Sequence, residues 1–382
     1  MSAGLPPDAA AADERFMDMA LALAARGLGR VWPNPAVGCV LVAPRPGGAG
    51  RVVARGWTRP GGRPHAETEA LARAGEAARG TTAYVSFEPC SHHGQTGPCA
   101  EALIAAGVTR AVVACEDPDP RVSGAGIARL RAAGVAVTEG VRAGQARRLN
   151  AGFVSRIMHG RPLVTLKLAT TLDGRIATHG GESQWITGPA ARSLAHRMRA
   201  EHDAVLVGIT TALADNPELT CRLPGMADRS PVRVVADSRG RLPLTARLVA
   251  TAAQTPTWLL TLGGGDARRL DAFRGAGVVV IEVPEADTGT IDPAAALAAL
   301  ADRGITRLLV EGGARLAAGL LRAGLVDRLA WFHAPTVLGG DGLAAVEAFG
   351  VDRLDRQPRF SRTAPVQPAG DDLLELYERT PV

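Results

Sequence analysis

EPCSHHGQTGPC, residues 88–99, and PHAE, residues 64–67, form the most specific pattern in this sequence. Zinc is usually bound by imidazole nitrogen and thiolate sulfur, and a catalytic zinc has three protein ligands with one position open. His65, Cys90 and Cys99 supply that donor set. Each cysteine follows a proline and is expected at or near a helix N-terminus, where the helix dipole favours the thiolate. The pattern therefore predicts a zinc site.

Glu67 follows the predicted ligand His65 by two positions. Residues two apart on a helix do not share a face, so we expect Glu67 to lie over a metal-bound water instead of binding the metal. Zinc lowers the pKa of such a water toward neutrality, and a carboxylate can pass its proton to a ring nitrogen and to departing ammonia. The pattern predicts a zinc-dependent deaminase that acts on a nitrogen heterocycle.

The spacing of the two cysteines separates this chain from the usual base deaminases. Those enzymes combine H-x-E with P-C-x-x-C, whereas eight residues lie between Cys90 and Cys99. A structural zinc would need a fourth ligand, for which His92 and His93 are candidates. Glu67, two positions after His65, favours a catalytic zinc with three protein ligands over a structural zinc with four. The remaining cysteines are interpreted as ordinary core or near-surface thiols, namely Cys39, Cys115 and Cys221.

The sequence around this pattern alternates between helical and extended periodicity. A helix is expected from Asp13, with Asp13 as its N-cap. Further helices are expected at 65–78, through 106 and around 126–133, and strands at 37–42, 52–54, 82–87, 111–114 and 135–138. This alternation predicts an α/β layer sandwich around a largely parallel sheet, with a domain at residues 13–145. The Arg-rich, less periodic segment 140–162 is the expected boundary.

The βα alternation resumes in the second half and predicts another α/β domain at residues 162–382. Its strands are expected at 163–168, 204–207, 232–236, 257–262, 278–283, 307–310 and 329–333. Helices are expected at 190–199, 294–303 and 315–323. We interpret Gly263–Gly265 as a flexible turn.

Composition is consistent with two globular domains, since 46% of the 382 residues are hydrophobic and 21% are charged. The net charge of +5 is spread along the chain, and aromatic residues make up only 4% of it. This pattern favours phosphorylated small molecules over nucleic acid. The acidic N-terminus lacks a signal-peptide pattern, no apolar stretch of membrane-spanning length occurs, and the cysteine count of five is odd. We expect a cytoplasmic enzyme without a membrane or nucleic-acid partner.

The order of motifs resembles one family, the bifunctional riboflavin-biosynthesis deaminase–reductases. The first half contributes WPNPAVGCV (32–40), PHAE (64–67), the stretch 88–99 and EDPDP (116–120). The second half contributes KLATTLDGR (167–175), GESQWIT (181–187), ADNPELTCR (214–222) and VEGGAR (310–315). The resemblance covers residues 13 to 350 and is specific because two unrelated motif sets occur in one chain.

The resemblance implies a cytidine-deaminase-like N-terminal domain and a dihydrofolate-reductase-like C-terminal domain. It implies deamination of 2,5-diamino-6-(5-phosphoribosylamino)pyrimidin-4-one, followed by NADPH-dependent reduction of the ribosyl side chain of the resulting aminouracil to ribityl. A homodimer formed through the reductase half is also implied. No G-x-G-x-x-G fingerprint follows a predicted strand, so an ordinary Rossmann site is not indicated.

Site residues carried over from the family fall on matching motif positions. Zinc falls on His65, Cys90 and Cys99, and Glu67 is the proton shuttle. Pyrimidine or phosphoribosyl contacts fall on Asn34 and His92. NADPH contacts fall on Ala169, Trp185, Thr211, Asp215, Ser238 and the loop from Gly313 to Gly319. Substrate contacts in the second half fall on Ser183, Arg199, Leu219, Arg222 and Glu311.

The chemistry of these residue types agrees with the implied ligands. Arginine can bind a phosphate through two parallel donors, and Gly312-Gly313 after a strand lets the backbone approach a cofactor phosphate. Arg239 and Arg241 near Ser238 could meet a 2′-phosphate, so NADPH is preferred over NADH. The proton donor for the reduction stays open between Lys167 and Asp215.

The chain departs from the family pattern at three positions. Thr58 and Glu69 stand where histidine is common, and Asp119 stands where asparagine is usual. None is a predicted metal ligand, so the departures concern substrate binding. One alternative is a zinc deaminase acting on nucleosides or tRNA, with a non-catalytic nucleotide-binding second domain. Another is a non-catalytic module in which zinc is structural.

Overall fold

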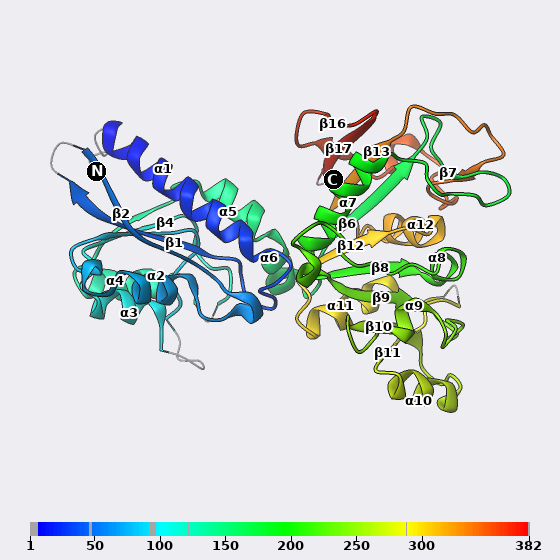
Figure 1. The fold of residues 1–382 in the computed structure, drawn as a ribbon, viewed down its shortest axis with the longest axis horizontal. Helices are drawn as coiled ribbons and strands as arrows, with labels where there is room; N and C mark the ends of the chain where they lie inside the picture. The colour runs from blue at the N-terminus through cyan, green and yellow to red at the C-terminus, as the bar shows by residue number, and fades with distance from the viewer. Residues whose placement is uncertain (1–6, 46–47, 92–96, 121, 288, 381–382) are drawn as a thin grey trace. The chain divides into compact units, whose positions relative to one another are not determined.

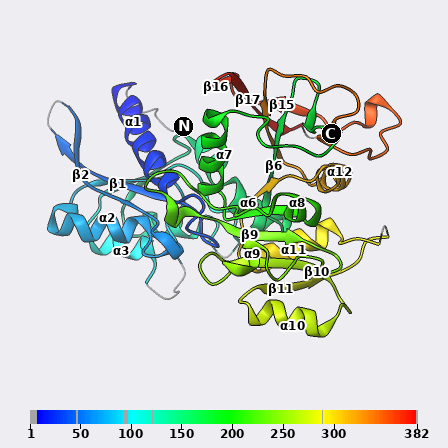
Figure 2. The ribbon, with the colours of Figure 1, turned by 45° about the vertical axis from the view of Figure 1, so that its right-hand side comes forward.

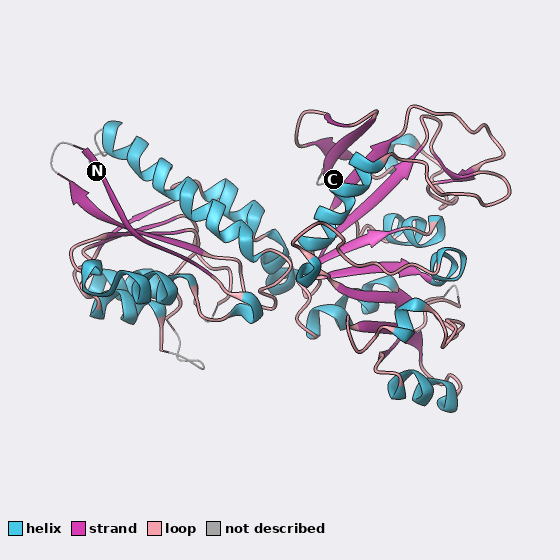
Figure 3. Cartoon of the chain, viewed as in Figure 1, coloured by secondary structure: helices cyan, strands magenta, loops and turns pink. Residues whose placement is uncertain are grey.

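The computed structural model describes residues 7–45, 48–91, 97–120, 122–287 and 289–380. The chain divides into two compact units, Met1–His159 and Gly160–Val382. Both units combine a central sheet with covering helices, as predicted (Figures 1 and 3). Among the described helices, none has both the length and the apolar composition needed to cross a membrane.

The sheet of the first unit has the strand order β2-β1-β3-β4-β5. β1 pairs antiparallel with β2 and β3, whereas β3, β4 and β5 are parallel. The first five residues of β1 are buried, because this strand is central and covered on both faces. The strands are β1 (Gly38–Arg45), β2 (Gly48–Trp57), β3 (Thr82–Val85), β4 (Arg110–Val113) and β5 (Ala136–Glu139).

Helices cover both faces of this sheet. Figures 1 and 2 show α1 on one face and α2 and α3 on the other, and Figure 1 shows α5 beside α1 and α4 beside α3. The core between them includes Phe16 and Met17 of α1, Leu41 of β1 and Leu103 of α3. The helices are α1 (Pro7–Ala24), α2 (Ala66–Ala74), α3 (Cys99–Ala105), α4 (Ala125–Ala132), α5 (Ala143–Leu149) and α6 (Ala151–His159), with 3-10 turns at Ala25–Gly27, Pro60–Gly62 and Gly75–Ala78.

Asp13 is not the N-cap that the sequence suggested. The helix begins at Pro7, and Asp13 lies inside it with 3% of its surface exposed. Its carboxylate accepts hydrogen bonds from Tyr84 Oη (2.8 Å) and from both terminal nitrogens of Arg110 (2.8 and 2.6 Å). The alanines before Asp13 favour helix strongly, which extends the helix toward the N-terminus. The network joins α1 to β3 and β4.

The segment expected as a domain boundary, residues 140–162, contains α5 and α6. Ala146 of α5 and Phe153 of α6 belong to the core of the first unit. The arginines of α5 and α6 interrupt the short apolar faces of these helices, so the sequence pattern did not predict them. The first unit therefore extends to His159.

The second unit contains a largely parallel sheet with the order β11-β10-β9-β8-β12-β6-β13-β17-β15, and β16 also pairs with β17. β17 is antiparallel to β13, β15 and β16. A short separate ladder joins β7 to β14. The strands are β6 (Leu163–Thr170), β7 (Arg175–Ala177), β8 (Ala204–Gly208), β9 (Val232–Ala236), β10 (Thr257–Leu262), β11 (Val279–Val283), β12 (Arg307–Glu311), β13 (Arg328–His333), β14 (Leu343–Ala344), β15 (Phe360–Arg362), β16 (Gln367–Ala369) and β17 (Asp372–Arg379).

Several elements of this unit were not predicted. They include β17, whose charged residues mask its alternation of apolar side chains, and α8, which is a short helix directly after β8. The helices are α7 (Pro189–Ala200), α8 (Ile209–Asp215), α9 (Arg247–Ala250), α10 (Ala267–Gly275), α11 (Pro293–Asp302) and α12 (Ala314–Arg322), with 3-10 turns at Ala227–Arg229 and Leu354–Arg356.

Two glycines set the close approach of helices to the first sheet. A Cβ atom on Gly38 would lie 1.9 Å from the carbonyl oxygen of Ala20 in α1. A Cβ atom on Gly56 would lie 2.2 Å from the carbonyl oxygen of Ala66 in α2. Because the obstacle in each case is backbone, a side chain can fit only if the helix moves. Gly56 thus fixes the first turn of the helix that carries Glu67.

Gly38→Ala tests this packing. Overpacking of a filled interior costs about 1–3 kcal/mol, so we expect the thermal unfolding midpoint of the full chain to fall by several degrees. Gly144→Ala is the matched control, because Gly144 lies in α5 with no atom within 4 Å of an added Cβ. That control should leave the midpoint unchanged or raise it. Equal midpoints for the two variants would contradict the packing argument.

Candidate active sites

The three predicted zinc ligands meet in the first unit. His65 is the N-cap of α2, and Cys99 is the first residue of α3. Cys90 lies in the loop that follows β3. The Nδ1 atom of His65 is 3.7 Å from Cys90 Sγ and 3.3 Å from Cys99 Sγ. Two helix N-termini and one strand-end loop therefore bring together residues that are far apart in the sequence.

This cluster fits a metal ion. One ligand atom from each of the three side chains lies within 4.8 Å of the other two, and one imidazole with two thiols is a common donor set for zinc. The backbone N–H of Cys99 donates to Cys90 Sγ at 3.2 Å. Hydrogen bonding to Cys99 lowers the pKa of Cys90 to about 4 despite partial burial, so Cys90 is a thiolate at neutral pH.

Glu67 lies beside the cluster and is almost fully buried, with 3% of its surface exposed. Burial raises the pKa of Glu67 to about 7; the nearby His65 opposes this shift and the Cys90 thiolate adds to it. A carboxyl group with a pKa near neutrality can both accept and return a proton at physiological pH. A buried carboxyl group with a pKa near neutrality thus lies next to the predicted metal site.

Two residues that depart from the family pattern organise the turn before α2. Thr58 is buried, and its Oγ1 accepts a hydrogen bond from the backbone N–H of Val37 at 3.0 Å. Glu69 accepts from the backbone N–H of Trp57 at 3.1 Å and forms ion pairs with Arg59 and Arg73. These side chains hold the backbone that leads to His65. They are therefore well suited to a structural role.

The other residues that the sequence singled out in the first unit make fewer side-chain contacts than the metal cluster, or lie outside the described residues. Asn34 lies half-buried, and its Nδ2 donates a long hydrogen bond of 3.5 Å to the carbonyl oxygen of Gly62. Asp119 is buried in the loop after β4, where its backbone N–H donates to Asp117 Oδ1 at 2.8 Å. His92, with the alternative fourth ligand His93, lies outside the described residues.

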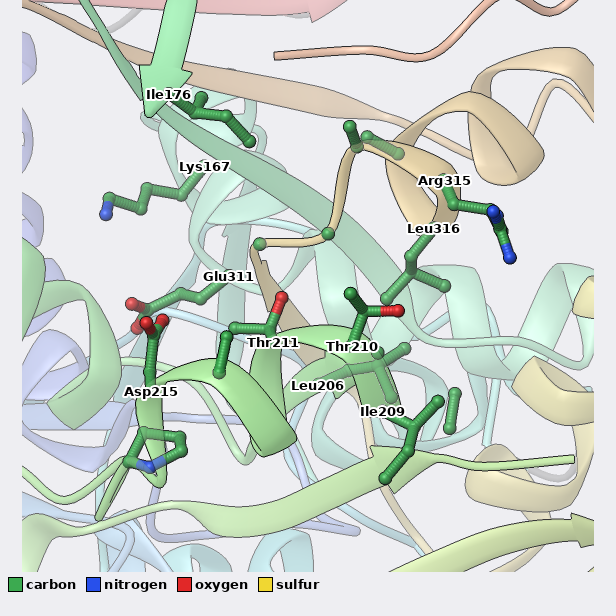
Figure 4. Close-up of a pocket in the computed structure, with 18 of the residues that line it drawn as sticks. Lys167, Ile176, Leu206, Ile209, Thr210, Thr211, Asp215, Glu311, Arg315 and Leu316 are labelled. Atoms are coloured by element: carbon green, nitrogen blue, oxygen red, sulfur yellow. The ribbon is translucent and has the colours of Figure 1, made fainter. Parts of the chain in front are cut away.

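A cavity of about 980 Å³ lies in the second unit. It opens at the carboxyl ends of the neighbouring parallel strands β6, β8, β9 and β12, the usual location of ligand sites in such sheets. Figure 4 shows Lys167, Thr211, Asp215 and Glu311 around it. Every cofactor and substrate residue expected in this half lines the cavity: Ala169, Ser183, Trp185, Arg199, Thr211, Asp215, Leu219, Arg222, Ser238, Glu311 and Gly313.

A buried group of charges forms one wall of the cavity. Arg199 donates through Nε and Nη2 to both carboxylate oxygens of Glu311, at 2.6 and 2.9 Å. Burial alone would raise the pKa of Glu311, but Arg199 and then Lys167 lower it to about 2. Burial lowers the pKa of Lys167, and Glu311 partly opposes this effect. Glu311 is therefore held ionised, whereas Lys167 gives up its proton more easily than a solvated lysine does.

The backbone around this wall adopts conformations that suit close approach by a ligand. Gly312 and Gly313 have φ values of 100° and 92°, and they connect β12 to α12. Leu219 has φ 56° although it is not glycine, and it is buried in the cavity wall. Such a conformation in a branched residue costs about 1–3 kcal/mol and is most frequent at functional sites.

The arginines proposed for a 2′-phosphate differ in position. Arg241 lines the cavity near Ser238, with Nε 3.5 Å from Asp237 Oδ1 and half of the side chain exposed. Arg239 is not among the described residues that line the cavity. Of the two, Arg241 is therefore the candidate to contact a cofactor there.

Sequence reasoning did not select His196, which also lines the cavity. It lies one helical turn before Arg199 on α7, and its Nδ1 is 3.1 Å from the carbonyl oxygen of Thr220 and 3.3 Å from the backbone nitrogen of Arg222. Burial, Arg199 and Arg222 lower its pKa, so the imidazole is neutral. The i, i+3 spacing of His196 and Arg199 was the available signal.

These two sites define a class of protein, an α/β enzyme in which a zinc-type deaminase centre and a charged, cofactor-sized cavity occupy separate units. Residues 10–115 match the model of the cytidine and deoxycytidylate deaminase zinc-binding region, and residues 162–364 match the RibD C-terminal domain. These matches agree with the order of the two structural units.

Relatives and solved structures extend the likeness over nearly the whole chain. The riboflavin biosynthesis protein RibD of Escherichia coli is 41% identical over 359 residues, covering 91% of this chain and 94% of the relative. RibD of Bacillus amyloliquefaciens is 42% identical over 328 residues, 86% of each chain. The structure of Acinetobacter baumannii RibD aligns with a TM-score of 0.85 at 38% identity, covering 97% of this chain and all of the other.

A Thermotoga maritima structure aligns with a TM-score of 0.83 at 34% identity, covering 97% of this chain and 99% of the other. That protein is described as a diaminohydroxyphosphoribosylaminopyrimidine deaminase/5-amino-6-(5-phosphoribosylamino)uracil reductase. The chain belongs to the RibD family of riboflavin biosynthesis proteins. It is a bifunctional enzyme with a zinc-binding deaminase domain and a reductase domain, which fit Zn²⁺ and NADPH as cofactors.

The predicted family, fold class and bifunctional activity are thereby confirmed. The alternative of a nucleoside or tRNA deaminase with a non-catalytic second domain is not favoured, because the second unit also matches a reductase domain of this family.

Cysteine replacement tests the metal cluster. We expect about one zinc per chain in purified protein, and Cys90→Ser or Cys99→Ser should reduce the zinc content at least tenfold, because a catalytic site has only three protein ligands. Cys221→Ser, a buried cysteine of the second unit, is the matched control and should retain zinc. Metal analysis by mass spectrometry measures the content, and zinc retained in Cys90→Ser would exclude this site.

Proposed function

We propose that the first unit deaminates 2,5-diamino-6-(5-phosphoribosylamino)pyrimidin-4-one. The second unit then uses NADPH to reduce the ribosyl side chain of 5-amino-6-(5-phosphoribosylamino)uracil to ribityl. One observation carries the proposal. A metal-ligand cluster beside buried Glu67 and a charged cavity occur in a chain that is 34% identical to the Thermotoga maritima deaminase/reductase over almost its entire length.

In the deaminase unit, His65, Cys90 and Cys99 would hold zinc, which supplies a Lewis acid that makes water nucleophilic near neutral pH. Glu67 accepts one proton of the attacking water and delivers it to the pyrimidine ring nitrogen. It then takes the second proton from the hydroxyl group formed at ring carbon 2 and delivers it to the amino group, which leaves as ammonia. Water adds to ring carbon 2 and ammonia leaves, so a carbonyl replaces the 2-amino group. The pKa of about 7 allows Glu67 to take both roles.

Asn34 and His92 are our candidates for contacts with the pyrimidine or the phosphoribosyl group. Within the described ranges, the side-chain amide of Asn34 makes one hydrogen bond, the long one to Gly62. Its polar atoms can therefore exchange that bond for one to the ring. The His92 assignment depends on its motif position alone.

In the reductase unit, conversion of a ribosylamine to a ribitylamine breaks the bond between C1′ and the ring oxygen. C1′ receives the hydride of NADPH and the oxygen receives a proton. Lys167 and Asp215 are the candidate proton donors: burial lowers the pKa of Lys167 and raises that of Asp215. Lys167 lies beside the ionised Glu311, whose charge favours its reprotonation after each turnover.

The cavity residues divide between the two ligands of the reduction. We assign NADPH to Ala169, Trp185, Thr211, Asp215, Ser238 and Gly313, and substrate to Ser183, Arg199, Leu219, Arg222 and Glu311. Arg222 is half-exposed and forms an exposed ion pair with Glu218, whereas Arg199 is held by the buried Glu311. Arg222 is therefore the better phosphate ligand, and Arg199 keeps Glu311 ionised and oriented.

We also infer that the enzyme is a cytoplasmic homodimer. None of the five cysteines forms a disulfide, which suits a reducing compartment. The dimer rests on analogy with the family, and sedimentation of the purified chain tests it.

Purified chain with the diaminopyrimidine substrate should release ammonia without NADPH and oxidise NADPH once it is added. Glu67→Gln should lower ammonia release by about 10²–10⁴-fold, because general acid–base catalysis contributes that much. Zinc content and NADPH oxidation with the aminouracil substrate should stay normal, which makes the second reaction an internal control. Full ammonia release by Glu67→Gln would remove Glu67 from the mechanism, and no release by the wild type would refute the proposed substrate.

Arg241→Ala tests the preference for NADPH. Loss of a partly exposed charge-assisted contact to the 2′-phosphate should raise the KM for NADPH about tenfold, equivalent to about 1.4 kcal/mol, and leave the KM for NADH unchanged. Arg239→Ala is the matched control, because Arg239 is not among the described cavity residues. Steady-state kinetics with both cofactors measures the effect, and equal changes for NADPH and NADH would contradict a 2′-phosphate contact.

A further inference from the structure

Glu88 immediately precedes the Pro89-Cys90 pair, yet it has no part in metal binding or proton transfer as described above. It lies just after β3, and only 4% of its surface is exposed. A buried carboxylate is costly unless hydrogen bonds satisfy it. The position and burial of Glu88 therefore indicate a specific set of partners.

Those partners are four backbone amides. Oε2 of Glu88 accepts from the N–H groups of Asp117 (3.1 Å) and Gly124 (3.0 Å). Oε1 accepts from the N–H groups of Gly126 (2.9 Å) and Ile127 (3.3 Å). The carboxylate thus binds one amide at the start of the loop after β4 and three amides where that loop enters α4.

α4 depends on this carboxylate for its N-terminal hydrogen bonds. The N-cap of α4 is Gly124, which has no side chain to accept from the free N–H groups of the first turn. Glu88 supplies the missing acceptor from a different segment, and its negative charge lies at the positive end of the helix dipole. A local cap would fix only the helix, whereas Glu88 also ties the helix to the metal-ligand loop.

The same contact region fixes the backbone of Cys90. A Cβ atom on Gly126 would lie 1.9 Å from the carbonyl oxygen of Pro89, so the first turn of α4 packs directly on the residue before Cys90. On the other side, the N–H of Ala100 in α3 donates to the carbonyl oxygen of Cys90 at 3.2 Å. Cys90 is therefore held between the N-termini of α3 and α4, and Glu88 makes the polar connection to α4.

β3 and β4 are parallel neighbours, so the loops that follow them emerge at the same edge of the sheet. The loop after β3 carries Cys90, and the described part of the loop after β4 includes residues 116–120 and 122–124. Glu88 is the carboxylate that joins these two loops. A shift in its position would move both the segment that carries Cys90 and the amides of the loop after β4 that it binds.

We propose that Glu88 is a positioning residue for the deaminase reaction. By binding four backbone amides it sets the place of Cys90 and of Asp117 and Gly124 in the loop after β4. The proposal rests on the proposed deaminase function of the first unit. Hydrogen bonds made by residues around a metal site orient the ligands, and loss of such bonds commonly reduces activity or metal affinity by about 10–100-fold. The effect acts through Cys90 and the loop, without contact between Glu88 and the substrate.

Glu88→Gln tests the proposal with little change of shape, because the amide NH₂ group would face N–H donors and lose at least one pair of hydrogen bonds. The matched control is Glu139→Gln, at an exposed glutamate of β5 that pairs with Arg131 at the opposite end of α4. Glu88→Asp keeps the charge but shortens the reach, so it should fall between the wild type and Glu88→Gln.

The first readout is amide hydrogen exchange of the metal-free full chain. Peptides spanning 114–128 should exchange at least tenfold faster in Glu88→Gln than in the wild type or in Glu139→Gln. The second readout is the visible spectrum of cobalt-substituted protein well below its unfolding temperature, where an altered Cys90 position changes the thiolate bands. The third is ammonia release, for which kcat should fall about 10–100-fold, with NADPH oxidation by the second unit preserved.

Unchanged exchange in 114–128 or an unchanged cobalt spectrum in Glu88→Gln would overturn the proposal. If Glu88→Gln also loses NADPH oxidation, the chain has unfolded generally, and Glu88→Asp then decides through the same readouts. A wild type without ammonia release would refute the proposed substrate alone, because hydrogen exchange and the cobalt spectrum still test the positioning role. Lower thermal stability with a normal spectrum and normal kcat would show a merely structural role.

Discussion

The deaminase centre depends on the close packing of α2 against β2, since this contact fixes the point where His65 meets the two cysteines. Gly56 leaves no room for a side chain between the strand and the backbone of Ala66. His65 is the N-cap of that helix and Glu67 lies in its first turn. One backbone contact therefore sets both a predicted metal ligand and the proposed proton-transfer group, and a movement of the helix would displace the two together.

In the second unit, the corresponding constraint is electrostatic. Glu311 is buried in one wall of the cavity beside the partly buried Lys167 and Arg199, where an unpaired charge would be costly. The bidentate bond from Arg199 satisfies Glu311 and leaves Lys167 with only partial compensation. The same arrangement that stabilises one carboxylate thus makes the neighbouring ammonium easier to deprotonate, which is the property required of a proton donor.

The sequence predicted those features that depend on short-range pattern. The His65, Cys90 and Cys99 cluster and the main parallel strands followed from residue type and periodicity. β17 and α5 were missed because charged side chains interrupt their short apolar faces. The helix start at Asp13 was wrong because the alanines before it continue the helix back to Pro7. The cavity residues came only from the resemblance, because no periodicity reveals that β6, β8 and β12 end side by side. His196 was missed for the same reason. The four amides that bind Glu88 lie 29 to 39 residues further along the chain, so no local pattern predicts their contact with it.

Two buried glutamates show how the surroundings assign opposite roles to one side chain. Burial raises the pKa of both Glu67 and Glu311. Near Glu67 the His65 ring opposes that effect, but the Cys90 thiolate reinforces it, so the pKa rests near 7. Beside Glu311 the Arg199 guanidinium overcomes burial and the pKa falls to about 2. Glu67 can therefore change its protonation state during a reaction at neutral pH, whereas Glu311 keeps a constant charge. A proton-transferring group in the first unit and a fixed electrostatic anchor in the second are what the two proposed reactions require.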